Sequence, residues 1–203
     1  MSFRVEKKVL FHSSDYIKLR TLIDKYNGFK LYPKRIVKSL YFDNRQKDMF
    51  VDAEEGTLPR KKIRIRSYPD YLKKKNFLET KISSIEGRFK STKKILDLKY
   101  NHIVKNGIFD NQYGLCYPIL WVLYEREYFS FLGKRITVDK NITYSAFNTF
   151  DKYLENEIII LETKSNSLNV NDIFDKLPEF REERISKYCK GVDKIFSNQI
   201  NKY

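Results

Sequence analysis

The feature that most constrains this sequence is the alternation of cations over residues 60–68. Successive side chains of a β-strand point to opposite faces of a sheet, so a period of two divides the residues into two sets. Ile63 and Ile65 fall in one set. The other set is polar throughout: Arg60, Lys62, Arg64, Arg66 and Tyr68. Such a strand needs apolar packing on one side and a partner for several positive charges on the other.

Five further predicted strands also carry charged residues on one face. These faces are Arg4, Glu6 and Lys8; Glu79 and Lys81; Tyr124, Arg126 and Tyr128; Arg135, Thr137 and Asp139; and Glu162 and Lys164. A solvated surface sheet explains any one of them, but it gives no reason to place tyrosine beside arginine or single glutamates among cations. A closed barrel with its charged residues inside explains all six. Because buried like charges are costly unless an anion neutralises them, such a tunnel predicts a polyanionic ligand.

The same periodicity predicts the fold class. Period-two stretches predict strands over about 3–11, 35–43, 60–68, 76–82, 88–94, 121–130, 134–140 and 157–164. Helices are predicted from Ser13 or Ser14 to Tyr26 and over 48–55, 94–106, 171–177 and 188–200. The chain has no internal repeat and no linker, so we predict a single domain over residues 1–203. Its expected class is α+β, with an antiparallel closed β-barrel and helices packed outside.

Composition indicates a folded, strongly basic chain. Aromatic residues make up 15% of the 203 residues, which is enough apolar material for a core. Lys and Arg number 40 against 26 Asp and Glu, giving a formal charge of +14. Residues 60–94 hold much of this excess, with 13 basic and 3 acidic residues. Charge alone therefore leaves nucleic acid, phosphate polymers, nucleotides and anionic membranes open as partners.

Residue counts exclude several kinds of site. The seven glycines are too far apart for a Walker A loop or a dinucleotide fingerprint, so any phosphate would be bound by side-chain cations. His12 and His102 are the two histidines of the chain, which excludes a two-histidine zinc motif and leaves carboxylates to hold a metal such as Mg²⁺ or Mn²⁺. Cys116 and Cys189 fit no pairing pattern and are expected to be free thiols.

No segment of the sequence is typical of a membrane span or a signal peptide. The longest apolar runs, 119–124 and 158–161, fall far short of the roughly 20 residues that cross a bilayer. Charged residues interrupt the first eight positions, so no signal peptide is predicted. We therefore expect a cytoplasmic location.

Eight motifs, in order along the chain, resemble those of the VTC domain, the catalytic domain of vacuolar transporter chaperone. This domain is a member of the triphosphate tunnel metalloenzyme (CYTH-like) superfamily. The motifs are Arg4-Val-Glu6-Lys-Lys8, Ser39-Leu-Tyr41-Phe-Asp43, Arg60-Lys-Lys62-Ile-Arg64-Ile-Arg66-Ser-Tyr68, Phe77-Leu-Glu79-Thr-Lys81, Tyr124-Glu-Arg126-Glu-Tyr128, Arg135-Ile-Thr-Val-Asp139, Leu161-Glu162-Thr-Lys164 and Ile185-Ser186-Lys187-Tyr188.

The resemblance implies a set of site residues. Contact with phosphoryl oxygens is implied for Lys8, Arg64, Arg66, Lys81, Arg126, Arg135 and Lys187. Substrate binding is further expected of Arg4, Lys62, Lys90, Tyr124, Lys164 and Ser186. Glu162 is the implied ligand of Mn²⁺ or Mg²⁺, and Glu6 and Glu79 are the next candidates.

The function implied by the resemblance is polymerisation of inorganic polyphosphate from ATP or another nucleoside triphosphate. The first strand carries one glutamate, Glu6, where tunnel hydrolases carry two, which makes those hydrolases a poorer match. A triphosphatase or nucleotide cyclase of the same fold remains an alternative. A non-catalytic module that binds polyphosphate or RNA is another. Nucleic acid is the less favoured ligand because no RNA-binding signature is present and a narrow tunnel excludes duplexes.

Overall fold

The computed structural model describes residues 5–69, 75–165 and 183–200. Arg4 and the helix predicted over 171–177 lie outside these residues, as do the side chains of Glu6 and Lys164. The roles predicted for Arg4 and Lys164 in substrate binding and for Glu6 in metal binding therefore stay predictions. No helix among the described residues is long and apolar enough to cross a membrane.

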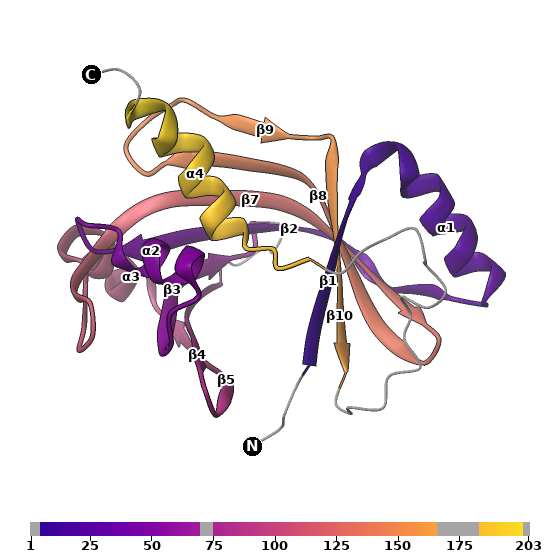
Figure 1. Ribbon diagram of the computed structural model, residues 1–203, viewed down its shortest axis with the longest axis horizontal. Coiled ribbons are helices and arrows are strands. Elements are labelled where there is room, and N and C mark those ends of the chain that lie inside the picture. The colour runs from indigo at the N-terminus through magenta and orange to yellow at the C-terminus, as the bar shows by residue number, and fades with distance from the viewer. Residues whose placement is uncertain (1–4, 70–74, 166–182, 201–203) are drawn as a thin grey trace. The chain divides into compact units, whose positions relative to one another are not determined.

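Strands dominate the described chain (Figure 1). They are β1 (Val5–His12), β2 (Phe29–Asp43), β3 (Arg60–Ser67), β4 (Asn76–Ser84), β5 (Gly87–Ile95), β6 (Ile108–Asp110), β7 (Gly114–Phe131), β8 (Lys134–Ala146), β9 (Tyr153–Glu155) and β10 (Ile158–Ser165). The helices are the 3₁₀ turn η1 (Ser13–Asp15), α1 (Tyr16–Lys25), α2 (Asp48–Glu55), α3 (Asp97–Asn106) and α4 (Lys187–Ile200).

The strand order is β1-β10-β8-β7-β2-β3-β4-β5, with β6 paired to β7 and β9 to β8. The registered pairs β1–β10, β10–β8, β2–β3, β3–β4, β4–β5 and β6–β7 are antiparallel. An antiparallel, sheet-dominated α+β fold is therefore confirmed. No pairing joins the end strands β1 and β5 among the described residues, so the closed barrel stays a prediction.

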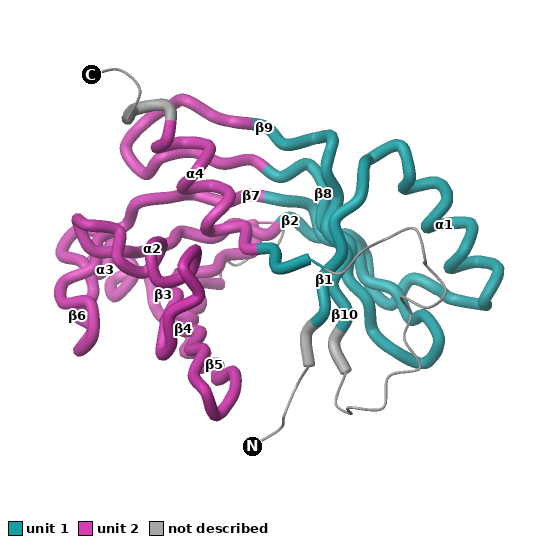
Figure 2. Tube along the Cα trace, in the orientation of Figure 1, with its two compact units in different colours: residues 1–36, 124–142, 154–185 teal, residues 37–123, 143–153, 186–203 magenta. Residues whose placement is uncertain are grey.

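The chain divides into two compact units, coloured separately in Figure 2. Unit 1 comprises residues 1–36, 124–142 and 154–185, and unit 2 comprises residues 37–123, 143–153 and 186–203. The long strands β2, β7 and β8 contribute residues to both units. The prediction of one domain over residues 1–203 stays a prediction.

The apolar half of the predicted alternation forms the core of unit 1. Val9 and Phe11 of β1 pack with the inward residues of β7, β8 and β10 in one buried cluster. Helix α1 supplies Leu19 and Ile23 to the same cluster, and both are fully buried. Because side chains alternate along each strand, Lys8, Asp139 and Glu162 occupy the face opposite α1, whereas Lys140 of β8 lies over the ring of Tyr16 on the α1 side. Unit 1 therefore has an apolar face covered by a helix, as the sequence predicts.

Helix α4 lies close to the sheet in unit 2 because residue 191 is glycine. A Cβ atom built there would lie 2.6 Å from Leu120 Cδ2 and 2.6 Å from Tyr144 Cδ1. Both of these side chains are fully buried and have little room to move. This close approach fixes the position of the start of α4, where two predicted site residues lie: Lys187 in its first turn and Ser186 just before it.

Most predicted boundaries agree with the structure, and four differ. Strand β8 ends at Ala146, six residues later than the sequence predicted. Strands β2 and β7 begin at Phe29 and Gly114, six and seven residues earlier than the sequence predicted. The helix predicted over 94–106 was wrong at its start. Lys94 and Ile95 pair with Phe77 and Asn76 of β4, so they continue strand β5 and the helix begins at Asp97.

We predict that Gly191→Ala destabilises the protein by about 1–2 kcal/mol despite the better helix propensity of alanine, because overpacking a well-filled contact typically costs about 1–3 kcal/mol. Urea unfolding of the variant measures the change. Ser197→Ala, at an exposed position of the same helix, is the matched control and should change stability little. A Gly191→Ala protein more stable than wild type would contradict close packing of α4.

Candidate anion-binding site

In unit 2, three cations converge on the buried carboxylate of Glu79. Arg64 and Glu79 are directly opposite each other in the β3–β4 register, and Arg64 Nε donates to Glu79 Oε2 at 2.8 Å. From β5, Lys90 Nζ donates to Oε1 at 2.7 Å. The Nη1 atom of Arg66 lies 3.6 Å from the same oxygen. Glu79 thus holds two guanidinium groups from β3 and one ammonium group from β5 in fixed positions.

A row of three lysines crosses the same face one register step away. Lys62 of β3 is opposite Lys81 of β4, and Lys81 is opposite Lys90 of β5. Like charges directly opposite on neighbouring strands repel each other and destabilise a sheet. Lys90 reaches Glu79, and Lys62 Nζ donates to Ser186 Oγ at 2.8 Å. Within β3, β4 and β5, the described carboxylate is Glu79 and the cations of this face are Lys62, Arg64, Arg66, Lys81 and Lys90, so these strands carry a positive excess.

The pKa values of neighbouring groups report that excess. Burial alone would raise the pKa of Glu79, but Arg64, Arg66 and Lys90 outweigh it and lower the pKa to about 2. Burial also acts to raise the pKa of the Tyr41 phenol, yet Arg64, Arg66 and Lys187 lower it below the usual value. A tyrosine hydroxyl that is buried and still easier to ionise indicates a strongly positive local potential.

The start of α4 is fixed to this face by buried polar contacts. Asp43, at the end of β2, accepts from the backbone N–H groups of Met49 and Phe50 and so caps α2. The hydroxyl of Tyr188 donates to Asp43 Oδ2. The ring of Tyr188 stacks on Tyr41 with centroids 5.1 Å apart. These contacts place the first turn of α4 beside the residues that surround Glu79.

Two buried polar atoms of this face have no hydrogen-bond partner among the described residues. They are Ser39 Oγ and Arg66 Nε, on residues that are opposite each other in the β2–β3 register. Buried polar groups are nearly always satisfied, so such atoms call for an explanation. An anion with several oxygens would satisfy both.

Unit 1 carries a second charged face, which is built around Arg126. Its guanidinium donates to both oxygens of Asp139, at 2.6 and 2.7 Å, and its Nη2 atom lies 3.7 Å from Glu162 Oε2. Burial would lower the pKa of Arg126, but Asp139 and neighbouring groups hold it well above the ordinary value. Glu162 is flanked in register by Lys8 and Thr137. The buried Thr137 Oγ1 has no hydrogen-bond partner among the described residues.

Lys8 and Tyr124, two further predicted residues of unit 1, lie beside this group. Lys8 Nζ donates to the carbonyl of Ile185 at 3.1 Å. Tyr124 lies under the Arg126 guanidinium, 5.3 Å from ring centroid to Cζ. Arg135 is exposed at the start of β8. No group of three or more His, Cys, Asp or Glu side chains that could hold a metal occurs in the described part of the chain.

Each unit thus gathers its own share of the predicted residues. Unit 2 brings together Lys62, Arg64, Arg66, Glu79, Lys81, Lys90, Ser186 and Lys187. Unit 1 brings together Lys8, Tyr124, Arg126 and Glu162. The site prediction missed Ser39, Tyr41, Asp43, Asp139 and Tyr188. Ser39, Tyr41 and Asp43 could have been found from the sequence, because they alternate with apolar residues and so share one face of the predicted strand.

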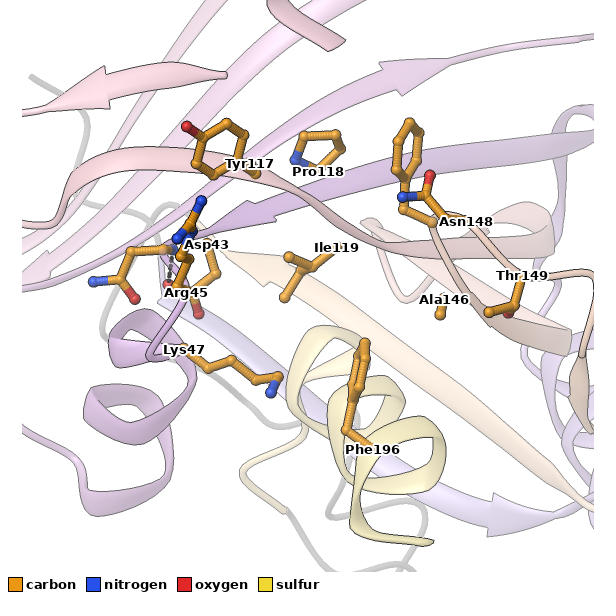
Figure 3. Close-up of a pocket in the computed structure, with 12 residues that line it drawn as sticks. Asp43, Arg45, Lys47, Tyr117, Pro118, Ile119, Ala146, Asn148, Thr149 and Phe196 are labelled. Atoms are coloured by element: carbon orange, nitrogen blue, oxygen red, sulfur yellow. Dashed lines mark hydrogen bonds between the residues drawn. The ribbon is translucent and has the colours of Figure 1, made fainter. Parts of the chain in front are cut away.

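Two pockets in unit 2 lie apart from the predicted residues. The first, of about 290 Å³, has a largely apolar lining, with Lys47 Nζ 4.8 Å from the centroid of the Phe196 ring (Figure 3). The second, of about 280 Å³, lies beside Trp121 and Lys38. Neither is lined by a predicted site residue. Each pocket carries cations of its own, Arg45 and Lys47 in the first and Lys38 in the second.

We predict that Glu79 stabilises the fold at neutral pH and loses that effect in acid. Its pKa falls from 4.5 to about 2 on folding, so its stabilisation is complete above pH 4.5 and is lost as the pH falls towards 2. Within that window stability should fall by up to about 1.4 kcal/mol per pH unit from this group. Glu79→Gln should remove this part of the slope in urea unfolding, whereas Glu86→Gln, at an exposed turn, should keep it. Equal slopes in the two variants would exclude the buried ion cluster.

Comparison with known proteins identifies a family for this chain. The family model of the VTC domain matches residues 3–114 and 105–196. No curated protein sequence matches the chain.

Solved structures match at low identity over nearly the whole chain. A candidate adenylate cyclase from Bacillus halodurans has a TM-score of 0.64 and 12% identity, covering 96% of this chain and 98% of that one. A candidate adenylyl cyclase from Hippeastrum, described as having a dominant triphosphatase activity, has a TM-score of 0.58 and 14% identity, covering 97% of each chain. A protein from Pyrococcus horikoshii has a TM-score of 0.54 and 19% identity, covering 94% of this chain and 99% of that one. With the family model matched across nearly all residues, the chain belongs to the VTC domain family.

Proposed function

We propose that this protein is a metal-dependent phosphotransferase that binds a nucleoside triphosphate such as ATP and extends a polyphosphate chain. The observation that carries the proposal is the lysine row of Lys62, Lys81 and Lys90. Three like charges in line weaken the empty protein, so a ligand of high negative charge density is the natural reason for their presence. The nearby unsatisfied donor of Arg66 supports the same ligand.

The chemistry of phosphoryl transfer suits these residues. The reaction depends on positioning the phosphates and neutralising charge on their non-bridging oxygens more than on covalent catalysis. Arg64 and Arg66 offer forked donors, and the lysines offer movable point charges. Within the proposal, Lys8, Arg126, Arg135 and Lys187 bind further phosphoryl groups, and the strands close into a tunnel within a single domain over residues 1–203. The proposed location is the cytoplasm.

Among the described side chains, a divalent metal fits best at Glu162. Its carboxylate is buried beside the unsatisfied hydroxyl of Thr137, and both are the hard oxygen donors that Mg²⁺ and Mn²⁺ prefer. Glu79 is left out of the proposed ligands because both its oxygens already accept from cations. Glu162, with Glu6 as a further candidate, would hold the ion. When bound, the ion would offset negative charge on the phosphates.

A triphosphatase or nucleotide cyclase is the second candidate, favoured by the likeness to the Hippeastrum protein, whose described activity is triphosphatase. A non-catalytic module for polyphosphate or RNA is the third. Product analysis separates the three after incubation with ATP and Mn²⁺ or Mg²⁺. Our proposal predicts long phosphate chains. Inorganic phosphate or a cyclic nucleotide as the main product would support the second candidate, and binding without turnover would support the third.

We predict that Lys81→Met weakens tripolyphosphate binding at least tenfold, because a lost charge-assisted hydrogen bond costs about 1.5–3 kcal/mol. The same variant should be as stable as the wild type or more stable when empty, because Lys81 faces two lysines. Calorimetric titration and urea unfolding measure the two effects.

The matched control is Lys93→Met. Lys93 is three residues after Lys90 on β5, so its side chain lies on the other face of the sheet, opposite Leu78. It should leave tripolyphosphate affinity nearly unchanged. If Lys81→Met lowered the stability of the empty protein and left affinity intact, the lysine row would be structural and the proposal would lose its main support.

A further inference from the structure

A cluster of two tyrosines and an arginine in unit 1 has no part in the phosphate contacts described above. The Cζ atom of Arg35 lies 5.4 Å from the ring centroid of Tyr32 and 5.5 Å from that of Tyr128. The two rings meet edge to face, with centroids 5.6 Å apart and planes at 85°. Tyr32 is 47% exposed, so much of this aromatic surface is open to solvent.

The cluster belongs to the charged face of unit 1. Tyr128 follows Arg126 by two residues on β7, so both side chains point to the same face, about 7 Å apart along the strand. Lys34, the residue before Arg35 on β2, pairs with Glu125 of β7. Glu125 is next to Arg126 in the strand, so its side chain points to the face opposite that of Arg126 and Tyr128. Arg35 therefore reaches the charged face, whereas Lys34 reaches the other one. Tyr32, three residues before Arg35, does not follow this alternation, and its place in the cluster is given by its ring contacts with Tyr128 and Arg35.

Surface stabilisation alone explains this arrangement poorly. A cation–π contact at an exposed site contributes only about 0.5–1 kcal/mol, and a strand end gains little from holding an aromatic ring in solvent. Exposed tyrosine rings combined with an arginine plane are, however, the surface on which nucleic-acid bases stack. The spacing from Arg126 to Tyr128 is comparable with the ribose that separates the phosphates of a nucleotide from its base.

We propose that Tyr32, Arg35 and Tyr128 form a stacking surface for the base of a nucleotide whose phosphates bind the charged face of unit 1. The inference rests on the proposed function and extends it, because it makes the base-bearing triphosphate, and not inorganic tripolyphosphate, the preferred ligand. Stacking depends on the flat ring and not on its hydrogen-bonding edge, so purine nucleotides should all bind, with little discrimination between adenine and guanine.

The test compares ATP and inorganic tripolyphosphate as ligands of the full chain in calorimetric titrations without divalent metal. Tyr32→Ala should weaken ATP binding by about 5- to 100-fold, the range expected for one lost base-stacking contact. Its affinity for tripolyphosphate should stay within about twofold of wild type, since no phosphate contact is removed. Tyr32→Phe keeps the ring and should bind ATP as the wild type does.

Phe29→Ala is the matched control, because it removes another exposed aromatic ring from the same strand outside the cluster. It should leave both affinities unchanged. Equal affinities of the wild type for ATP and tripolyphosphate, or an unchanged ATP affinity in Tyr32→Ala, would overturn the stacking surface while leaving the proposed function standing. If the wild type bound neither ligand, the proposed function itself would fail, and the stacking surface with it.

Discussion

The ion cluster around Glu79 is the interaction on which the charged face of unit 2 depends. Without a carboxylate at this position, Arg64, Arg66 and Lys90 would repel one another in a poorly solvated environment. With it, the three cations are held at defined positions before any ligand arrives. Preorganised charge of this kind favours binding because less side-chain freedom is lost on association. The sheet register supplies the geometry, since Arg64 and Glu79 are direct partners across β3 and β4.

Helix α4 completes the same face and shows how apolar packing serves polar chemistry. Gly191 allows the helix to approach the sheet closely, and Tyr188 joins it to Asp43. Asp43 also caps α2, so one buried carboxylate connects two helices to the end of β2. Ser186, the residue before the helix, is then placed to accept from Lys62. Lys62 also donates to Cys189 Sγ of α4 at 3.6 Å, so the lysine row and the helix are coupled through this one side chain.

The sequence predicts the strands and the two faces of each strand well, because a period of two is a local property. It could not reveal the contacts of Tyr188 with Asp43, since these residues are 145 positions apart and a pattern within one segment does not report contacts with another. The role of Asp139 was missed for a related reason. Its position on the charged face was evident, but only the fold shows that it holds Arg126 by two hydrogen bonds. Lys94 and Ile95 were assigned to a helix because pairing with β4, which decides their conformation, leaves no trace in their own residue types.

The most direct test of the account is the ionisation of Tyr41, which senses the cations without belonging to the predicted phosphate contacts. Its pKa can be followed by nuclear magnetic resonance in protein labelled at the tyrosine Cζ position, with Tyr41→Phe assigning the signal. The account predicts a pKa below the usual value near 10 in the empty protein, because Arg64, Arg66 and Lys187 outweigh burial. Added tripolyphosphate should raise that pKa by neutralising the same cations. A pKa at or above 10 in the empty protein, or one that tripolyphosphate leaves unchanged, would contradict the presence of a positive face that awaits an anion.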